Sequence, residues 1–375
     1  MTGKERLNCI LHKQPTDRIP WSTLVDNLTR SVMPPEIRDK PVLDFYRYIG
    51  CDIACFGNYG LPGELSVKPP CRLVQPDVTN ERATNPDGTT VNTTRTSWGT
   101  LTATFIKGHP IKHPVETIED LRVLKKTWLH SCYEEAGTEA EESYARLITA
   151  LGDDGVYVYT FKPSPLQMLL EYDMGLVNAY ALLADYPEEF SELLAIMHSR
   201  RIQEYEICAR RMPCEAFMPV ENTSTTMISP DIYEKFSLPQ IKDLVDIMHR
   251  HNKKVILHMC GLIRDLLPLI KQTGADGINS LCQSPIGNTP FETALDVLGD
   301  DIIIWGGSLD DTLFHSPHSF SKANLEQYLA RIMTPRIRKA NFLLGVGGDG
   351  RETPVEHYLI VKEWMEKFGT KCFTI

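Results

Sequence analysis

Short apolar runs alternate with longer amphipathic stretches along the chain from about residue 116 onward. The apolar runs are VYVYTF (156–161), AFMPVE (216–221), KVILHMC (254–260), DGINSLC (276–282), DIIIWGG (301–307) and NFLLGVG (341–347). Such short, nearly continuous apolar runs predict strands that are buried on both faces. The stretches between them have the spacing of helices, so the pattern predicts a series of strand–helix units.

Helices are predicted at 117–126, 133–149, 165–184, 187–210, 230–251, 262–273, 290–298, 325–338 and 354–368. Strands that are each followed by a helix imply a parallel sheet, because a crossover helix returns the chain to the same edge. At least six such units favour a closed barrel over an open sheet. An open, doubly wound sheet is the alternative, but no G-x-G-x-x-G or phosphate loop supports it. The prediction is an α/β protein with a (β/α)8 TIM barrel.

The first 115 residues are irregular and rich in Pro, Thr, Asn and Gly. They begin with a stretch typical of a helix and contain a short predicted strand at 51–57. The Thr-rich segment 71–105 carries an Asn-Pro-Asp-Gly turn at 85–88, which indicates a β-hairpin. We expect a single domain over 1–375, with an irregular, hairpin-bearing part (1–115) and regular βα units (116–375).

Composition narrows the class of protein. The formal net charge of −10 would repel nucleic-acid phosphates, so neither DNA nor RNA is an expected partner. No stretch has the roughly 18 consecutive apolar residues of a membrane span. The ten cysteines are scattered, and the N-terminus lacks the apolar run of a signal peptide. These features favour an intracellular, cytoplasmic protein with reduced thiols.

The ends of the predicted strands carry the candidate chemistry, because α/β barrels place their active sites there. His258 and Cys260 are two apart at a strand end, so their side chains point to the same face. Imidazole and thiolate are preferred Zn²⁺ ligands. Glu221 ends the strand before and Cys282 the strand after, and either side chain could converge on the same metal ion. The ordinary alternative is a core histidine beside small buried cysteines, with Glu221 capping a turn.

Two glycine-rich strand ends add further candidates. Gly306 and Gly307 end one predicted strand, and Gly347 ends the last one. Glycine allows close approach of a cofactor to the backbone, although tight turns at the barrel rim explain these positions equally well. Asp349 is a candidate catalytic acid or metal ligand, and Glu221 a candidate catalytic carboxylate.

Several of these segments together resemble the uroporphyrinogen-decarboxylase superfamily. The resemblance rests on KERLNCILHKQPTDRIPW (4–21), TFKPSPLQMLLEYDMG (160–175), HMCGLIRDLLPLIKQTGADGINSL (258–281), GNTPFETALDVLGDDIIIWGGSLD (287–310) and TPVEHYLIVKEW (353–364). It spans essentially the whole chain. The family's fold is the TIM barrel, which agrees with the prediction from the strand–helix pattern.

The resemblance implies one of two activities. Decarboxylases of the family carry an Arg-rich segment after the first strand, and here that place reads RIPWSTLVDNLTRSV (18–32) without the paired arginines. The chain therefore looks more like the corrinoid-dependent methyltransferases, in which a His-x-Cys pair binds zinc. By this resemblance, His258 and Cys260 would bind Zn²⁺.

The thiol-activating members of this branch have a further Cys ligand in the last strand's loop, where this chain reads GVGGDG (345–350). Cys282, Glu221 or Asp349 would have to complete the site. The absence of this Cys favours a reaction other than the thiol-activating one, with a methyl donor such as a methoxylated compound that is O-demethylated. Its methyl group would pass to a corrinoid (cobalamin) held by a separate partner protein, since no Asp-x-His-x-x-Gly corrinoid motif occurs here.

Two other functions stay open at this point. One is a decarboxylase or lyase acting on a non-porphyrin acid, with Lys162, Arg264 and Arg351 as the candidate cations. The other is a ligand-binding barrel without catalytic activity. A homodimer is the assembly considered beside the corrinoid-protein partner.

Overall fold

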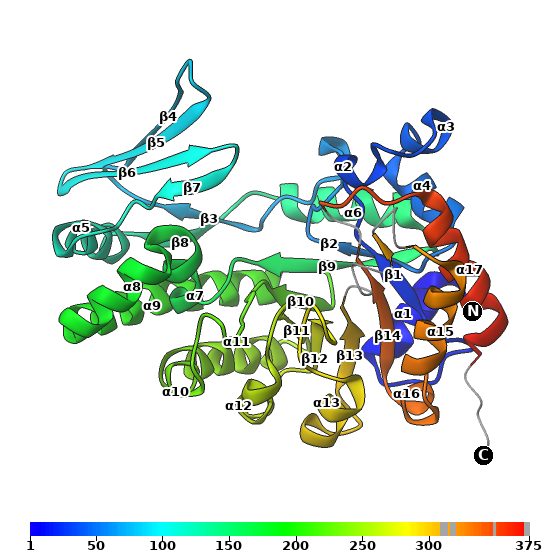
Figure 1. Ribbon diagram of the computed structural model, residues 1–375. Coiled ribbons are helices and arrows are strands. Elements are labelled where there is room, and N and C mark those ends of the chain that lie inside the picture. Colours follow the sequence, from blue (N-terminus) through cyan, green and yellow to red (C-terminus); the bar gives the residue numbers. More distant parts are fainter. Residues whose placement is uncertain (308–313, 316–319, 348–349, 371–375) are drawn as a thin grey trace.

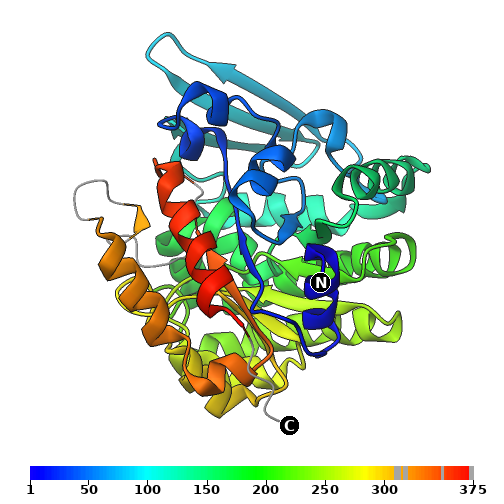
Figure 2. The same cartoon turned by 90° about the vertical axis from the view of Figure 1, so that its right-hand side faces the viewer.

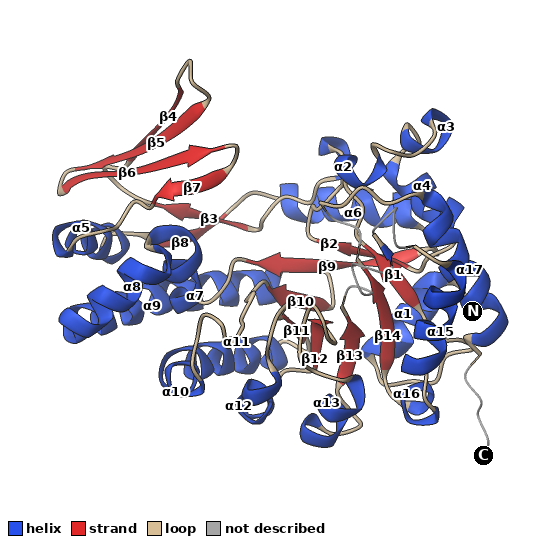
Figure 3. Ribbon diagram, viewed as in Figure 1, coloured by secondary structure: helices blue, strands red, loops and turns tan. Residues whose placement is uncertain are grey.

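Eight parallel strands curl into a nearly closed barrel with helices around it (Figures 1 and 3). The structure is a computed structural model that describes residues 1–307, 314–315, 320–347 and 350–370. The strand order is β1-β14-β13-β12-β11-β10-β9-β2. The strands are β1 (Trp21–Thr23), β2 (Ile53–Phe56), β9 (Gly155–Phe161), β10 (Ala216–Pro219), β11 (Lys254–His258), β12 (Gly277–Leu281), β13 (Ile303–Gly306) and β14 (Phe342–Val346). The predicted (β/α)8 barrel is therefore confirmed.

The seam of the barrel lies between β1 and β2, where the backbone N–H of Asp52 donates to the carbonyl of Trp21 at 2.8 Å. The Asp52 carboxylate also accepts from the Trp21 N–H at 3.1 Å. Arg6 and Arg18 bind the same carboxylate, at 3.1 Å and 2.8 Å. Because Asp52 is only 1% exposed, this three-residue ion cluster holds the seam together at the amino-terminal rim.

The interior of the barrel holds a separate apolar cluster, and α1 (Gly3–Leu11) closes the barrel at one end. Leu7, Ile10 and Leu11 of α1 pack with inward-facing strand residues that include Ile256 and Trp305. The N–H of Lys4 donates to the carbonyl of Asp153, just before β9, so α1 lies at the amino-terminal ends of the strands. Figure 2 views the molecule from the side of α1, which is dark blue there. The open end is therefore the carboxyl-terminal mouth.

A second, larger apolar cluster fills the layer between the barrel and its helices. Outward-facing strand residues such as Phe217 and Leu257 belong to it. Helices and turns that follow the strands are α2 (Asn27–Arg30), α3 (Pro35–Arg38), α4 (Val42–Ile49), η1 (Gly63–Leu65), α5 (Ile118–Leu129), α6 (Glu139–Leu151), α7 (Pro165–Met168), η2 (Leu169–Asp173), α8 (Gly175–Asp185), α9 (Pro187–Arg211), α10 (Pro230–Ile232), η3 (Tyr233–Ser237), α11 (Leu238–Arg250), η4 (Arg264–Leu266), α12 (Leu267–Gln272), α13 (Phe291–Leu298), α15 (Lys322–Ile332), α16 (Pro335–Lys339) and α17 (Val355–Phe368).

The predicted hairpin region forms a four-stranded antiparallel sheet, β4-β5-β6-β7, beside α5 (Figure 1). Its strands are β4 (Thr79–Thr84), β5 (Thr89–Thr96), β6 (Gly99–Ile106) and β7 (His109–Lys112). The turn at 85–88 lies where the sequence predicts it, with the N–H of Asn85 donating to Thr89 at 2.8 Å. Gly88 adopts the positive φ of +85° that such a turn requires.

Some local predictions need correction. The first 115 residues, predicted to be irregular, supply two barrel strands, and β1 was missed because three residues are too few to show a period. The predicted helix 133–149 begins too early, because residues 132–135 form strand β8 (Cys132–Glu135), which pairs antiparallel with β3 (Cys71–Val74). The predicted helices at 165–184 and 230–251 are each interrupted by a π-helical turn, η2 and η3.

In the part of the chain that the structure describes, no helix combines the length and the apolarity of a membrane span. Nine described cysteines are present as thiols.

Candidate active site

A pocket opens at the carboxyl-terminal mouth of the barrel, with about 440 Å³ of empty volume. It is lined from six barrel strands and the loops that follow them. Small, hydroxyl-bearing and aromatic side chains dominate the lining, which consists of Ser22, Thr23, Leu24, Phe56, His258, Asn279, Ser280, Trp305, Gly306, Gly307, Gly345, Val346 and Gly347. Four residues singled out from the sequence are among them: His258, Gly306, Gly307 and Gly347.

His258 is the last residue of β11 and has the same parity as Ile256, which faces the barrel interior. Its imidazole therefore points into the mouth. Nδ1 lies 2.6 Å from Oδ1 of Asn279, on the neighbouring strand β12. With the amide oxygen at this contact, Nδ1 is the donor of the hydrogen bond. A second hydrogen bond of this kind fixes the tautomer and orientation of metal-binding histidines.

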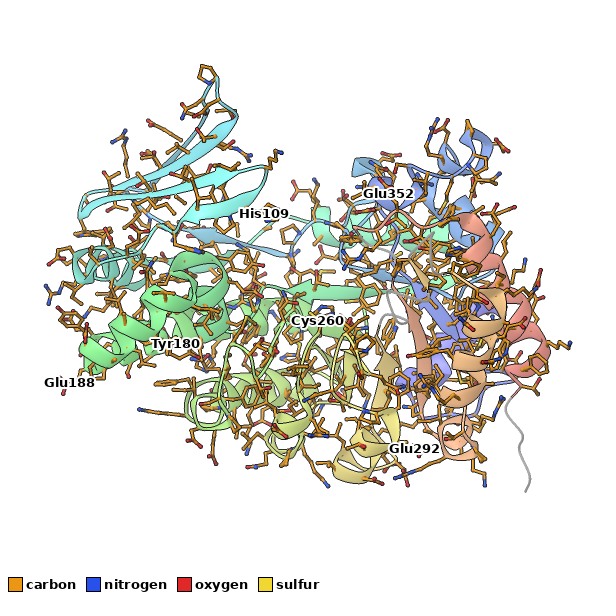
Figure 4. The ribbon with its side chains drawn as sticks, in the orientation of Figure 1. His109, Tyr180, Glu188, Cys260, Glu292 and Glu352 are labelled. Carbon is orange, nitrogen blue, oxygen red and sulfur yellow. The ribbon has the colours of Figure 1, made fainter. Side chains whose placement is uncertain are left out.

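Cys260 follows two residues later and is exposed. Its Sγ lies 3.5 Å from Oδ1 of Asn222, in the loop after β10. Figure 4 labels Cys260 beyond the end of β11, near the centre of the molecule. Both residues of the predicted pair therefore lie at the carboxyl-terminal end of β11, where the thiol is accessible, but only His258 lines the mouth pocket.

Glu221 lies close by in sequence but faces the other way. Its parity is that of Phe217, which packs in the outer apolar layer, whereas Met218 faces the barrel interior. The two carboxylate oxygens accept from the Ser164 N–H at 2.8 Å and the Ser164 hydroxyl at 2.7 Å. Burial raises the pKa of Glu221 to about 7, although the bonds from Ser164 and the charge of Arg201 pull the pKa down. Glu221 is thus a buried carboxyl group between the sheet and its helices.

Arg201 of α9 fixes the loop that carries Ser164. It is 4% exposed, forms an ion pair with Glu204 and donates to the carbonyl of Lys162 at 2.6 Å. Its guanidinium also lies 5.0 Å from the ring centroid of Tyr205. The Ser164–Glu221 contact is therefore held by an ordered network in the outer layer.

Cys282 is not among the residues that line the mouth pocket. It is 3% exposed, and its Sγ donates to the carbonyl of Ser280 at 3.1 Å. Ser280 has a φ of +61°, and the pairing register of β12 with β13 shifts between Asn279 and Leu281. This irregularity moves the end of β12 out of the simple alternation on which the sequence prediction depended.

The glycines at the mouth are required by packing. A Cβ on Gly307 would lie 2.5 Å from the sulfur of Cys282, and a Cβ on Gly345 would lie 1.7 Å from the carbonyl oxygen of Gly306. The strands β13 and β14 can approach this closely only without side chains. A cofactor-binding role for Gly306, Gly307 and Gly347 stays a prediction, and Asp349 lies outside the described residues.

Among the residues that the structure describes, no three His, Cys, Asp or Glu side chains are grouped to hold a metal ion. The predicted set of His258, Cys260, Glu221 and Cys282 is therefore not brought together. The parity of Glu221 and the bulge before Cys282 are the physical reasons. Lys162, Arg264 and Arg351 do not line the mouth pocket.

Sequence reasoning missed Asn279, Phe56 and Trp305. Asn279 is a polar residue inside an otherwise apolar strand, and that break in the pattern is the signal that could have identified it. Phe56 and Trp305 come from distant segments and meet at 4.8 Å between ring centroids on the pocket wall. Nothing in the sequence indicates this contact.

The uroporphyrinogen decarboxylase (URO-D) family model matches residues 106–349, more than half of the chain. A uroporphyrinogen decarboxylase from Trichlorobacter lovleyi is 26% identical over 121 residues. The methylcobamide:CoM methyltransferase MtbA from Methanosarcina acetivorans is 34% identical over 87 residues. These matches span 32% and 24% of the lengths of the two relatives.

Among solved structures, a methyltransferase from Methanosarcina mazei superposes with a TM-score of 0.59 at 16% identity. The superposition covers 98% of this chain and 99% of that protein. At this identity the likeness shows the fold alone.

Proposed function

Since the chain belongs to the uroporphyrinogen decarboxylase family, we propose that it is a zinc-dependent methyltransferase that exchanges methyl groups with a corrinoid carried by a separate protein. The observation that carries the proposal is the end of β11, where His258 projects into the mouth pocket and is oriented by Asn279. The 34% identity with MtbA over 87 residues supports methyl transfer as the kind of reaction.

The residues at the mouth have the donor chemistry that zinc prefers. An imidazole and an accessible thiol two residues later are a nitrogen and a sulfur ligand. Glu221 and Cys282 are committed to Ser164 and to the carbonyl of Ser280, so we no longer propose them as partners of His258. Asp349 stays the candidate for a further ligand. When bound, Zn²⁺ would polarise the heteroatom that carries the methyl group.

The pocket lining favours a small, uncharged methylated substrate. Phe56 and Trp305 provide aromatic walls, and Ser22 and Thr23 provide hydroxyl groups. Such a lining fits the ring and the ether oxygen of a methoxylated aromatic compound better than the many carboxylates of a porphyrinogen, which require cations. In this proposal the wall holds the ring, and Asn279 keeps the imidazole oriented while the corrinoid protein docks over the open mouth.

Zinc analysis of the purified chain tests the proposal. We expect about one zinc ion per chain in the wild type, and loss of most of it in His258→Ala and in Cys260→Ala. Cys9→Ala serves as the matched control, since Cys9 lies in α1 at the opposite end of the barrel. Full zinc retention in both variants would overturn the metal assignment.

A methyl-transfer assay tests the reaction itself. Cob(I)alamin and 2-methoxyphenol are mixed with the enzyme, and the absorbance change on formation of methylcobalamin is followed. Coenzyme M with methylcobalamin is run in parallel as the thiol reaction. Transfer with either pair that disappears in His258→Ala supports the proposal, and equal rates in wild type and variant contradict it.

A further inference from the structure

A second cavity lies away from the mouth, between the four-stranded sheet and the π-helical turn η2. It has about 810 Å³ of empty volume and shares no lining residue with the mouth pocket. The sheet and the helix face each other across it. Its lining residues include Asn92, Thr94, Leu101, Phe105, Glu171 and Tyr172.

The pleat of the sheet gives this cavity a mixed floor. Asn92 pairs directly with Ala103, and Thr94 with Leu101, so these side chains share one face of the sheet. Leu101 and Ala103 are buried at 5% and 7% exposure. The floor is therefore apolar on β6 and polar on β5, as a site for an amphipathic small molecule would be.

Two hydrogen-bond acceptors in this cavity have no donor among the described residues. They are Oδ1 of Asn92, on the sheet, and Oε2 of Glu171, on η2. The other oxygen of Glu171 accepts from Nε2 of Gln167 at 3.1 Å, which orients the carboxylate. Acceptors buried without donors cost free energy, and both residues line this cavity. A ligand that brings N–H or O–H groups would satisfy both.

The charge of the cavity wall favours a cationic ligand. Glu171 is a carboxylate, and the described lining contains no Lys, Arg or His. The rings of Tyr172 and Phe105 add electron-rich faces, which attract cations. Tyr172 is 53% exposed, so its ring is accessible. Glu171 and Tyr172 lie in a π-helical turn, and such turns are frequent at functional sites.

We propose that this cavity binds a small organic ammonium ion that has N–H donors and an apolar body. The N–H groups would bridge Glu171 and Asn92, and the apolar body would lie on Leu101 and Phe105. Figure 1 shows the sheet at the far side from β1 and β14, whose residues line the mouth pocket. The cavity is therefore a ligand site in addition to the barrel mouth, independent of the methyl-transfer proposal.

Benzylammonium is a suitable probe, because it joins three N–H donors to an aromatic body. Isothermal titration of the full chain is expected to show saturable binding with a Kd of about 1 mM, typical of a small fragment. Benzyl alcohol lacks the charge, and benzyltrimethylammonium lacks the N–H donors. Each is expected to bind at least about tenfold more weakly.

Two variants locate the site. Glu171→Gln keeps the shape of the side chain and is expected to weaken benzylammonium binding about tenfold. Asn92→Asp adds a second carboxylate and is expected to strengthen binding by roughly threefold, a gain that a misfolded protein could not produce. Glu188→Gln, on the surface of α9 and labelled in Figure 4, is the control: Glu188 does not line the cavity, so the affinity should be unchanged.

Three results would overturn the proposal. The first is the lack of saturable binding by wild type, and the second is equal affinity in wild type and Glu171→Gln. The third is a crystal soaked with benzylammonium in which the ligand occupies the barrel mouth and not the cavity beside Asn92.

Discussion

The two rims of the barrel differ in whether charged groups are buried and in whether the opening is filled. At the amino-terminal rim, α1 fills the opening, and Asp52 is buried between Arg6 and Arg18. At the carboxyl-terminal rim, the pocket is open, and His258 projects into it with its Nδ1 at 2.6 Å from Oδ1 of Asn279. The closed rim fixes the barrel, and the open rim offers reactive groups. Stability and chemistry are thus assigned to opposite ends of the same strands, as is general for this fold.

The residues at the open rim do not all face the pocket. His258 ends β11 and faces the mouth, whereas Glu221, which follows the neighbouring strand β10, faces the outer layer. A residue at the reactive rim is therefore not automatically part of the reactive pocket. The parity of each strand decides which side of the sheet its last residue faces.

The largest expected effect is at the closed rim. Asp52→Ala leaves Arg6 and Arg18 without their shared carboxylate, so the unfolding free energy should fall by about 3–5 kcal/mol. Urea denaturation measures this loss. Asp44→Ala removes the exposed partner of Arg47 and should have a far smaller effect. Equal losses of unfolding free energy in both variants would show that the buried ion cluster at the closed rim stabilises the fold no more than an exposed ion pair does.

At the open rim, His258→Ala should act on activity and hardly on stability. The rate of methyl transfer to cob(I)alamin is expected to fall at least about 100-fold, because a metal ligand is lost. The unfolding free energy should change by only about 1 kcal/mol, the value of the hydrogen bond to Asn279. If the variant lost several kcal/mol of stability and kept its activity, His258 would be a structural residue.

The pH dependence of the unfolding free energy tests whether Glu221 is buried away from the pocket. Burial raises the pKa of Glu221 from 4.5 to about 7, so this group favours folding most at acidic pH. Its contribution is fully present below pH 4.5 and is lost as the pH rises through 7. At about 1.4 kcal/mol per pKa unit, Glu221→Gln should gain roughly 2–3 kcal/mol relative to wild type across this window.

Paired urea denaturation of wild type and Glu221→Gln at several pH values measures this gain. Glu188→Gln, which lies on the surface of α9, is the control. A difference between wild type and Glu221→Gln that does not vary with pH would contradict the buried, protonated carboxyl group.

The smallest expected effect concerns Asn279. Asn279→Ala removes the acceptor that orients the His258 imidazole, so zinc affinity should fall about tenfold while the ligands themselves remain. Competition with a chelator measures the affinity. Asn279→Asp keeps an acceptor oxygen at the same place and should restore most of the affinity. Wild-type affinity in Asn279→Ala would mean that the hydrogen bond does not position the ligand.

Local pattern alone identified seven of the barrel strands, the strand–helix order and the turn at 85–88, because these depend on short-range periodicity and turn chemistry. It also placed His258 at the mouth, since its strand is regular to its end. The short strand β1, the outward direction of Glu221 and the bulge before Cys282 depend on contacts between segments far apart in the sequence. So do the pairing of Asn279 with His258 and the cavity between the peripheral sheet and η2. The sequence by itself determines which residues end each strand, whereas the packing of neighbouring strands decides which of them face the same space.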